Sequence, residues 1–324
     1  MTRPVVVVLG ATVEDPPPGI ADAAALADLR YAPDATALET VMPDAEALFF
    51  WRANKSWVEG VFASASNLRW IQSASDGVDG LLFPALAAST VAVTNARGVF
   101  DDPIAEWVIG AMCAFVTGLH TTIAAQARGA GWNDDRHRER LAGQHLVIVG
   151  PGPIGRATAA RARALGLTVE SVGRRARDDE LLGTVHAHDR LHEALGRADH
   201  VLDALPLTDA TRHLFDADAF AAMRQSARFY NVGRGGTVEE AALIEALRAG
   251  TIAGAALDVY EEEPLLATSP LWAMPNVIVS PHICGDFAGW EEAVVAVFVD
   301  NVGRFARGET LRNPVDTSAG FGVG

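Results

Sequence analysis

The sequence predicts an α/β protein with two doubly wound parallel sheets, and three observations predict this class. Short apolar runs alternate with helix-patterned segments along the chain, which favours parallel strands covered by helices on both faces. One apolar run, 146–149, is followed by glycines in a G-x-G-x-x-G pattern and then by a helix pattern. The length of 324 residues suffices for two domains, each with its own core.

The composition narrows the class of protein and its partners. Hydrophobic residues make up 49% and charged residues 21% of the chain, which is typical of a folded globular protein. The net charge of -15 predicts no broad basic surface, so we expect no nucleic-acid partner. The apolar run at 5–9 is too short for a signal peptide or a membrane span. With only two cysteines, Cys113 and Cys284, a disulfide framework is not expected, and we predict a cytoplasmic protein without membrane contact.

The first hundred residues predict a small α/β domain. Strand-like apolar runs lie at 5–9, 47–51, 68–72 and 91–94. A proline-rich break at 15–19 follows the first run, and 20–29 has a helix pattern. This alternation predicts a parallel sheet with helices on its faces.

A long helix pattern at 103–126 predicts the connection into a second domain. Asp101 and Asp102 are candidates for its N-cap, and Pro103 suits the first helical turn. Another long helix pattern, 290–307, is expected to return to the first domain, because that domain otherwise lacks a covering helix. The predicted domains are therefore 1–98 with 288–324, and 99–287.

The second domain predicts a further doubly wound sheet of the dinucleotide-binding kind. Its strand-like runs lie at 146–149, 168–172, 200–204, 228–231, 253–257 and 277–280. Helix patterns occupy the intervals, notably 156–165 and 239–249. Strands that alternate with helices in this way form a sheet with both faces covered.

The glycines after the run 146–149 have the context of a phosphate-binding turn. Gly150 permits the tight turn out of the strand, and Gly152 has no side chain to hold a pyrophosphate away from the backbone. Gly155 lets the following helix lie close on the sheet, and the helix N-terminus offers N–H groups to the anion. A glycine-rich turn in an ordinary α/β protein is the alternative interpretation.

The end of the next strand predicts which dinucleotide binds. A carboxylate about 20 residues beyond the glycines would accept hydrogen bonds from the ribose 2′-hydroxyl and select NAD. Gly173 falls near that position, and Arg174 and Arg175 follow it, whereas Glu170 lies in the middle of the strand. Guanidinium groups suit a 2′-phosphate. We therefore predict that NADP(H) is preferred and that NAD(H) is possible; a solvated basic turn is the alternative.

Three more motifs carry a family resemblance: NVGRGG at 231–236, ALDVYEEEPL at 256–265 and SPHICG at 280–285. Together with GPGPIG at 150–155 they resemble the D-2-hydroxyacid dehydrogenase family. The resemblance extends to GVDG at 77–80, IAEW at 104–107, LPLTDATRHLF at 205–215 and GETLRNPVD at 308–316. It implies a Rossmann-type cofactor domain inserted in a flavodoxin-like substrate domain. The arginines after Gly173 resemble the glyoxylate/hydroxypyruvate reductase branch.

The resemblance implies three catalytic residues. Arg234 matches an arginine that binds the carboxylate and the carbonyl group of a 2-oxoacid. His282 matches the acid/base that exchanges a proton with the substrate oxygen, and Glu263 matches the carboxylate that holds this imidazole. Simpler alternatives are a surface arginine, a structural histidine and a solvated acidic loop, and Glu263 competes with its neighbours Glu261 and Glu262.

The resemblance also implies contacts to the cofactor and the substrate. Asp258 matches a residue that contacts the nicotinamide amide. The other implied cofactor residues are Pro153, Ile154, Leu205, Pro206, Thr211, Val232 and Gly233. The implied substrate residues are Ser75, Asp76, Gly77 and Val78, whose backbone N–H groups would receive a carboxylate, with Arg234 and His282. Trp51 is a further candidate for the substrate pocket or for the core. Asp76 departs from the small apolar residue that is usual in the family, and an acid beside an anionic substrate is unfavourable unless it points away.

The sequence therefore predicts an NADPH-preferring reductase of a small 2-oxoacid, such as glyoxylate or hydroxypyruvate. The alternatives are a nucleotide-sensing binding protein like the corepressors that resemble this family, and a dehydrogenase of formate or phosphite. A homodimer is expected from the family, and Trp132 is a candidate for contact with the partner. We predict no metal site at His186, His188 and His192, which have no cysteine nearby, and no nucleophilic role for Cys284.

Overall fold

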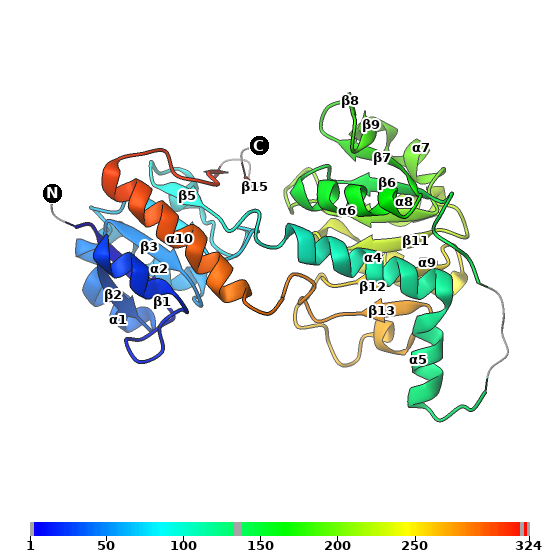
Figure 1. Ribbon diagram of the computed structural model, residues 1–324, viewed down its shortest axis with the longest axis horizontal. Helices are drawn as coiled ribbons and strands as arrows, with labels where there is room; N and C mark the ends of the chain where they lie inside the picture. Colours follow the sequence, from blue (N-terminus) through cyan, green and yellow to red (C-terminus); the bar gives the residue numbers. More distant parts are fainter. Residues whose placement is uncertain (1–2, 133–137, 318–320, 323–324) are drawn as a thin grey trace. The chain divides into compact units, whose positions relative to one another are not determined.

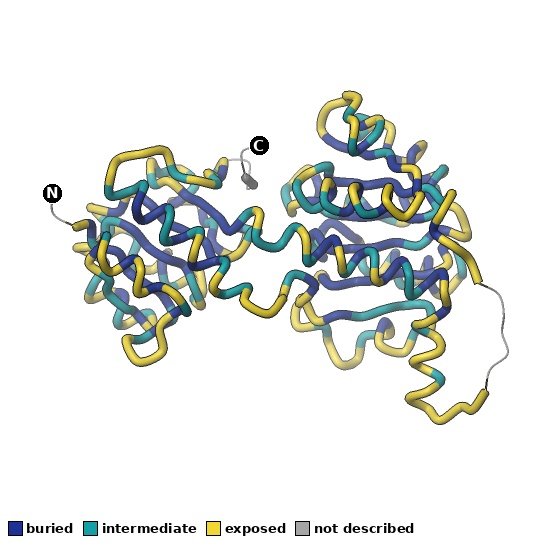
Figure 2. Tube along the Cα trace, viewed as in Figure 1, coloured by how far each residue is buried: buried dark blue, intermediate teal, exposed yellow. Residues whose placement is uncertain are grey.

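The computed structural model describes residues 3–132, 138–317 and the backbone of 321–322. The chain forms two compact units (Figure 1). Unit 1 comprises Met1–Phe100 and Phe287–Gly324, and unit 2 comprises Asp101–Asp286. In both units the central strands are among the most buried parts of the chain (Figure 2).

Unit 1 contains a five-stranded parallel sheet. Its strands are β1 (Val5–Leu9), β2 (Asp28–Ala32), β3 (Ala47–Phe50), β4 (Trp70–Ser73) and β5 (Ala92–Thr94). Their order across the sheet is β2-β1-β3-β4-β5, the order of flavodoxin-like sheets. Together with the sheet of unit 2, this confirms the predicted α/β class with two doubly wound parallel sheets.

The helix predicted over 20–29 is wrong beyond residue 25. Ile20–Ala25 forms a 3-10 helix, and Asp28–Ala32 is the edge strand β2. The five residues of β2 are mostly half-exposed, since only Ala32 is buried. An edge strand pairs on one side only, so its sequence DLRYA lacks the continuous apolar run that marks the central strands.

Helix α10 (Trp290–Arg307) belongs to unit 1, as the sequence predicts. It packs on one face of the sheet, where the ring of Phe298 stacks on Phe49 at 4.1 Å and lies 5.8 Å from Trp70. Beside these rings Asn301 is fully buried and donates to the side-chain oxygen of Gln72 at 2.9 Å. The opposite face is covered through buried residues of α1 (Ala35–Val41), α2 (Lys55–Val61) and α3 (Pro84–Ala87).

The long helix predicted over 103–126 is two helices. Helix α4 (Asp101–Thr117) ends before Gly118, whose φ of 67° lies in the left-handed region, and α5 (Leu119–Ala127) follows at an angle of 79°. Asp101 and Asp102 lie inside the first turn of α4 rather than at its cap. Among the described residues no single helix has the length and apolarity to span a membrane; the bent pair α4 and α5 meets these two criteria together.

Unit 2 contains an eight-stranded sheet in the order β13-β12-β11-β10-β6-β7-β9-β8. The predicted strands are β6 (His145–Val149), β7 (Thr168–Gly173), β10 (His200–Asp203), β11 (Arg228–Asn231), β12 (Gly254–Leu257) and β13 (Val277–Val279). They are all parallel. The chain starts in the middle at β6, proceeds to one side through β7 and then returns to β10, as in dinucleotide-binding sheets.

Two strands at one edge of this sheet were not predicted. These are β8 (Arg177–Asp179) and β9 (Gly183–Ala187), which pair antiparallel with each other. β8 is polar and mostly exposed, and β9 has a single large apolar residue, the buried Val185, so no apolar run marks either strand.

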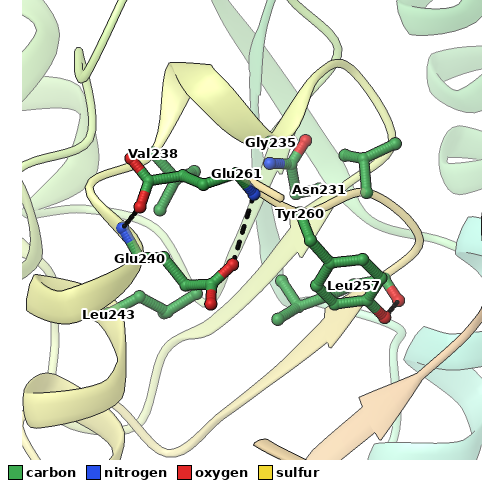
Figure 3. Close-up of a pocket in the computed structure, with 9 residues that line it drawn as sticks. Asn231, Gly235, Val238, Glu240, Leu243, Leu257, Tyr260 and Glu261 are labelled. Carbon is green, nitrogen blue, oxygen red and sulfur yellow. Dashed lines mark hydrogen bonds between the residues drawn. The ribbon is translucent and has the colours of Figure 1, made fainter. Parts of the chain in front are cut away.

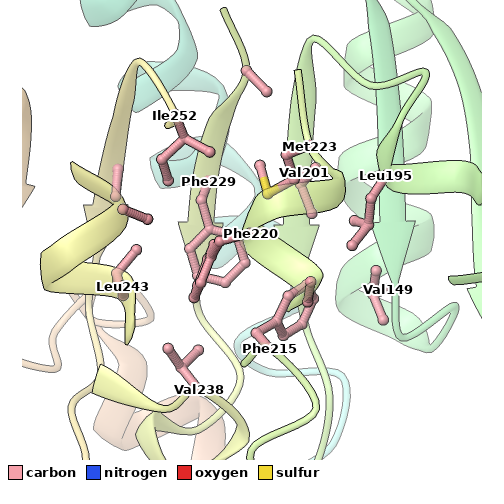
Figure 4. Close-up of a cluster of buried hydrophobic side chains, with 14 of the residues drawn as sticks. Val149, Leu195, Val201, Phe215, Phe220, Met223, Phe229, Val238, Leu243 and Ile252 are labelled. Atoms are coloured by element: carbon pink, nitrogen blue, oxygen red, sulfur yellow. The ribbon is translucent and has the colours of Figure 1, made fainter. Parts of the chain in front are cut away.

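The core of unit 2 explains why its helices form where they do. Helices α6 (Pro153–Ala164), α7 (Leu191–Leu195), α8 (Ala217–Ala222) and α9 (Glu240–Ala249) fill the intervals between strands. Phe220 of α8 and Leu243 of α9 lie against Phe229 and Val201 of the sheet (Figure 4). This cluster fixes the strands whose carboxyl ends carry the residues described next.

Candidate active site

The glycine turn between β6 and α6 has three glycines with different surroundings. Gly150 has φ 103°, and a Cβ there would lie 2.6 Å from the carbonyl oxygen of Ala204. A Cβ on Gly155 would lie 2.6 Å from the carbonyl oxygen of Gly150. A Cβ on Gly152 would meet no described atom within 4 Å. Packing therefore requires two of the glycines, whereas the third leaves room at the N-terminus of α6 for an anion to approach the backbone.

The turn lies where the strand order reverses. Strands β6 and β10 are neighbours, and Val149 is paired with Asp203 at their carboxyl ends. Ligands of open α/β sheets bind at such a switch point. Leu205 and Pro206 follow β10, and the Thr211 hydroxyl closes their loop by donating to the carbonyl of Pro206 at 2.7 Å. The structure thus places Leu205, Pro206 and Thr211 beside the glycine turn, with Thr211 serving the loop itself.

The corner after β7 has the residues from which NADP(H) is predicted. Arg174 and Arg175 are exposed directly after Gly173, the last residue of β7. A Cβ on Gly173 would lie 2.8 Å from Cγ of Pro151 in the glycine turn. The proline ring therefore occupies the space that a carboxylate side chain at this position would need. Together with the open N-terminus of α6, this corner suits a dinucleotide with a 2′-phosphate.

The loop after β11 holds Arg234. Asn231 accepts a hydrogen bond from the backbone N–H of Gly233 at 3.0 Å, and Arg234 donates to the carbonyl of Gly233 at 2.8 Å. A Cβ on Gly235 would lie 1.8 Å from the carbonyl carbon of Tyr260, so only glycine permits this close approach. The NVGRGG loop is thereby held against the segment that leads to Glu263.

His282 and Glu263 form a hydrogen-bonded pair. Nδ1 of His282 lies 2.7 Å from Oε2 of Glu263, and the other oxygen of Glu263 accepts from the backbone N–H of Tyr260 at 3.0 Å. His282 has φ 58°, a left-handed conformation that is costly for a residue other than glycine. The loop after it is held by Asp258, whose carboxylate accepts from the backbone N–H groups of Ile283 and Cys284 at 3.0 and 3.1 Å.

The pair shifts both titrations. The hydrogen bond that His282 donates to Glu263 raises the pKa of His282 above its ordinary value, against the opposing effect of partial burial. Burial disfavours the ionised form of Glu263, but its bonds to His282 and Tyr260 outweigh this and lower its pKa. The charge of Arg234 lowers the pKa of both groups. His282 and Glu263 thus form a contact between separate segments of unit 2, and their pairing favours the imidazolium and carboxylate forms.

Glu261, another acid of the EEEP segment, lies beside Glu240 (Figure 3). Glu261 accepts from the backbone N–H of Glu240, and Glu240 accepts from that of Glu261, each at 3.3 Å. Glu261 also pairs with His213 at 2.6 Å. Glu261 therefore fixes its loop to the start of α9, and Glu263 is the acid that reaches His282.

Asp258 and Tyr260 position the segments that carry the pair. Asp258 is nearly fully buried, and its bonds to the 283–284 backbone occupy its carboxylate in this structure. The Tyr260 hydroxyl donates to the carbonyl of Ser280 at 2.8 Å, just before His282. Tyr260 was not predicted as a site residue, because the role of its hydroxyl depends on the pairing of β12 and β13.

In unit 1, the loop after β4 contains the predicted substrate residues. The backbone N–H of Ser75 donates to the Ser73 hydroxyl at 3.2 Å, whereas those of Gly77 and Val78 donate to no protein acceptor within the described ranges. The carboxylate of Asp76 accepts from the amide of the buried Asn95 at 3.0 Å. Asn95 also donates to the carbonyl of Asp76 at 2.6 Å, so Asp76 and Asn95 together stabilise the conformation of the loop.

The remaining residues singled out in the sequence differ in their surroundings. Trp51 stacks on Trp290 at 6.0 Å and lies 5.4 Å from Phe49, so it packs on the core of unit 1. His186 bonds to Glu170 at 2.9 Å, within a cluster that lowers the pKa of this glutamate to about 2. Burial raises the pKa of the Cys284 thiol, which disfavours a thiolate. Val232 and Gly233 are buried at the end of β11, whereas Pro153 and Ile154 are half-buried in the first turn of α6.

Comparisons with known proteins show the family of the chain. The family model described as "D-isomer specific 2-hydroxyacid dehydrogenase, NAD binding domain" matches residues 109–284. The glyoxylate/hydroxypyruvate reductase B of Salmonella schwarzengrund is 36% identical over 265 residues, which cover 78% of this chain and 80% of that protein.

Solved structures resemble the whole chain. An NADPH-dependent glyoxylate/hydroxypyruvate reductase from Sinorhizobium meliloti, in complex with NADP and sulfate, has a TM-score of 0.82 and 28% identity, covering 99% of this chain and 100% of that one. A D-isomer specific 2-hydroxyacid dehydrogenase from Xanthobacter autotrophicus, in complex with NADPH and MES, has a TM-score of 0.81 and 29% identity, with the same coverage.

Proposed function

The chain belongs to the D-isomer specific 2-hydroxyacid dehydrogenase family, and from this premise we propose that it reduces a small 2-oxoacid with NADPH. It is an NAD(P)-dependent oxidoreductase by family. Glyoxylate and hydroxypyruvate are the proposed substrates, since a relative that covers most of the chain is named for both. The observation that carries the proposal is the His282–Glu263 pair beside Arg234.

Each of the three residues has a proposed role in this reaction. Arg234 binds the carboxylate and the carbonyl oxygen of the 2-oxoacid, which fixes the carbonyl carbon for attack. His282, charged through its contact with Glu263, donates a proton from Nε2 to the carbonyl oxygen. Glu263 keeps Nδ1 protonated and orients the ring. The cofactor supplies the hydride when bound.

We propose NADPH as the preferred cofactor and NADH as a weaker one. Gly173 cannot bind a ribose 2′-hydroxyl, and Arg174 and Arg175 offer positive charge at the same corner. The Sinorhizobium relative is described as NADPH-dependent. We assign cofactor binding to unit 2, and we propose that the backbone N–H groups of Gly77 and Val78 in unit 1 also contribute to binding of the substrate carboxylate.

A substrate panel tests the proposal. Initial rates with glyoxylate, hydroxypyruvate, formate and phosphite, each measured with both nucleotides, should show fastest turnover of a 2-oxoacid with NADPH. Clear preference for NADH would overturn the cofactor assignment. Oxidation of formate or phosphite would replace the proposed substrates, and nucleotide binding without any turnover would favour the corepressor-like alternative.

The acid/base role has a matched control in the same unit. His282→Ala should lower kcat for glyoxylate by roughly 100-fold or more, with nearly unchanged NADPH binding, because only proton transfer is removed. His213→Ala is the control, since His213 also has a left-handed φ, 51°, and also pairs with a glutamate. Equal losses in the two variants would contradict the role of His282.

We further propose that the protein forms a homodimer through α5. No residue of α5 is buried, and the exposed fractions of Leu119 and Ile123 are 51% and 56%. Trp132, which follows α5 closely in sequence, is 94% exposed. Exposed apolar clusters of this kind mark protein interfaces. A mass of one chain by light scattering at micromolar concentration would exclude the dimer. A cytoplasmic location remains a prediction.

A further inference from the structure

A buried carboxyl group lies at the end of β10, and Thr237 connects it to the loop that carries Arg234. Asp203 is fully buried, and its Oδ1 accepts from the backbone N–H of Leu205 at 3.0 Å. Its Oδ2 lies 2.5 Å from the hydroxyl of Thr237, which is also fully buried. The same hydroxyl lies 2.6 Å from the carbonyl oxygen of Arg234. The three groups form a chain from the sheet to the main chain of Arg234.

The hydrogen atoms of this chain can be counted. A threonine hydroxyl carries one hydrogen and can donate one bond. The carbonyl of Arg234 can only accept, and an ionised Asp203 could only accept as well. With Asp203 ionised, the hydroxyl can donate to only one of these two oxygens, and the carbonyl of Arg234 then keeps only its longer bonds from the Asn231 amide and the Thr237 backbone N–H, at 3.3 and 3.2 Å. With Asp203 protonated, its O–H donates to Thr237, and Thr237 donates to the carbonyl of Arg234. Both short contacts are then hydrogen bonds.

We propose that Asp203 is held protonated and donates a hydrogen bond to the Thr237 hydroxyl. Thr237 in turn donates to the carbonyl of Arg234, and these two bonds position the backbone of Arg234 for binding of the 2-oxoacid. Asp203 and Thr237 are positioning residues in this scheme, since neither touches the substrate. The inference rests on the proposed function of Arg234. Ionisation of Asp203 would then make substrate binding by Arg234 depend on pH.

The surroundings of Asp203 contain little to stabilise a negative charge. On the neighbouring strands it is paired with Val149 and Asn231, neither of which is charged. The segment 203–205 is enclosed by two glycines, since a Cβ on Gly150 or Gly233 would lie 2.6 or 2.5 Å from backbone atoms of Ala204 or Leu205. Burial raises the pKa of Asp203 to about 7, against the bonds from Thr237 and Leu205, and no charged side chain contributes to this shift. The proton is therefore lost near physiological pH.

The kinetic test compares variants across pH 6 to 9. In the wild type, KM for glyoxylate should rise above about pH 7 as Asp203 ionises, whereas Asp203→Asn should keep the low KM at all pH values. Asparagine donates to Thr237 and accepts from Leu205 without titrating. Thr237→Val should raise KM about tenfold at pH 6 with kcat within about twofold, and Thr237→Ser should restore it. Identical KM profiles of wild type and Asp203→Asn, or an unchanged KM in Thr237→Val, would overturn the proposal.

A second measurement does not depend on catalysis. The infrared difference spectrum between pH 6 and pH 9 should contain a protonated-carboxyl band that is absent in Asp203→Asn. A band that persists in the variant would show that Asp203 is not the buried acid, whatever the enzyme turns over. If the wild type reduces no 2-oxoacid, the proposed function fails while this band still tests the proton. If Asp203→Asn does not fold, the Thr237→Val and Thr237→Ser pair decides.

Discussion

At the scale of single residues, the chemistry of His282 depends on one contact. The bond from Nδ1 to Glu263 raises the pKa of the imidazole, and Tyr260 and Asp258 hold the two segments that make this contact. A raised pKa keeps the imidazole protonated to higher pH, and reduction of a carbonyl needs the protonated form. If His282 has the proposed acid role, we expect the carboxylate of Glu263 to set the pH range of reduction together with the histidine.

Glu263→Gln should move the alkaline limit of glyoxylate reduction to lower pH. The amide can still accept from Nδ1 but lacks the charge, so the pKa of His282 falls, and the limb of kcat against pH should shift by about one unit. Glu262→Gln, in the neighbouring exposed acid, is the control and should leave the limb in place. An unshifted limb in Glu263→Gln would show that the pair does not control the proton.

Gly173→Asp should not create an NADH-preferring enzyme by itself. Its Cβ would lie 2.8 Å from Cγ of Pro151, so the glycine turn must shift, and kcat/KM should fall for both nucleotides. Adding Pro151→Ala removes the atoms in contact and should restore activity with NADH in preference to NADPH. Steady-state kinetics with both cofactors measure this. Full NADPH activity in the single variant would contradict the steric argument.

The sequence predicted some site residues and left others undecided, for physical reasons. Gly150 and Gly155 are required by local chain geometry, so a local pattern reveals them. The choice of Glu263 over Glu261 depends on which carboxylate meets His282, a contact across nineteen positions of sequence. Asp203 was missed, although an acid that ends an apolar strand is a signal that could have drawn attention to it.

At the scale of elements, helix α10 covers one face of a sheet whose strands lie far from it in sequence. Its buried face, with Val294, Val295 and Phe298, completes the core that begins with Val6 and Val8 of β1. The long amphipathic pattern made this helix predictable, including both ends. The edge strands β2, β8 and β9 were not predictable in the same way, because one-sided pairing places little apolar demand on their residues.

Phe298→Ala should destabilise unit 1 by about 3–5 kcal/mol. The substitution removes a fully buried ring that stacks on Phe49 and lies beside Trp70. Urea unfolding followed by tryptophan fluorescence should show a lower midpoint. Ala296→Ser, at an exposed position of the same helix, is the control and should change the stability by about 0.5 kcal/mol or less. Equal midpoints would mean that α10 is not part of the core.

At the scale of the whole molecule, buried titratable groups determine the response to acid. His200 is fully buried, with Nε2 at 2.7 Å from the Gln144 oxygen and Nδ1 at 2.9 Å from the Tyr230 hydroxyl. Burial lowers the pKa of His200 to about 4. The folded protein therefore keeps this histidine neutral at pH values at which the unfolded chain binds a proton.

The contribution of His200 to the free energy of unfolding should fall as the pH falls from about 6.5 to 4, whereas Asp203, whose pKa burial raises to about 7, contributes in the opposite direction. At the His200 site the unfolded state binds one more proton than the folded state in this window, so His200 contributes a loss of up to ~3 kcal/mol, and no loss above pH 6.5. Urea titrations at several pH values measure the slope. His200→Gln should have a shallower slope than the wild type, whereas His192→Gln, in a helix at the surface, should retain it. Parallel slopes would contradict the contribution of His200.

The division of unit 1 between the two ends of the chain has a consequence for biosynthesis. While the ribosome is still translating unit 2, the rings of Phe49 and Trp70 lack the helix that covers them, since α10 begins only at Trp290. Unit 2 is continuous in sequence and is complete at Asp286. The nascent chain can therefore fold its nucleotide-binding unit first. The N-terminal segment keeps an exposed apolar face, which chaperones can bind, until α10 has been synthesised.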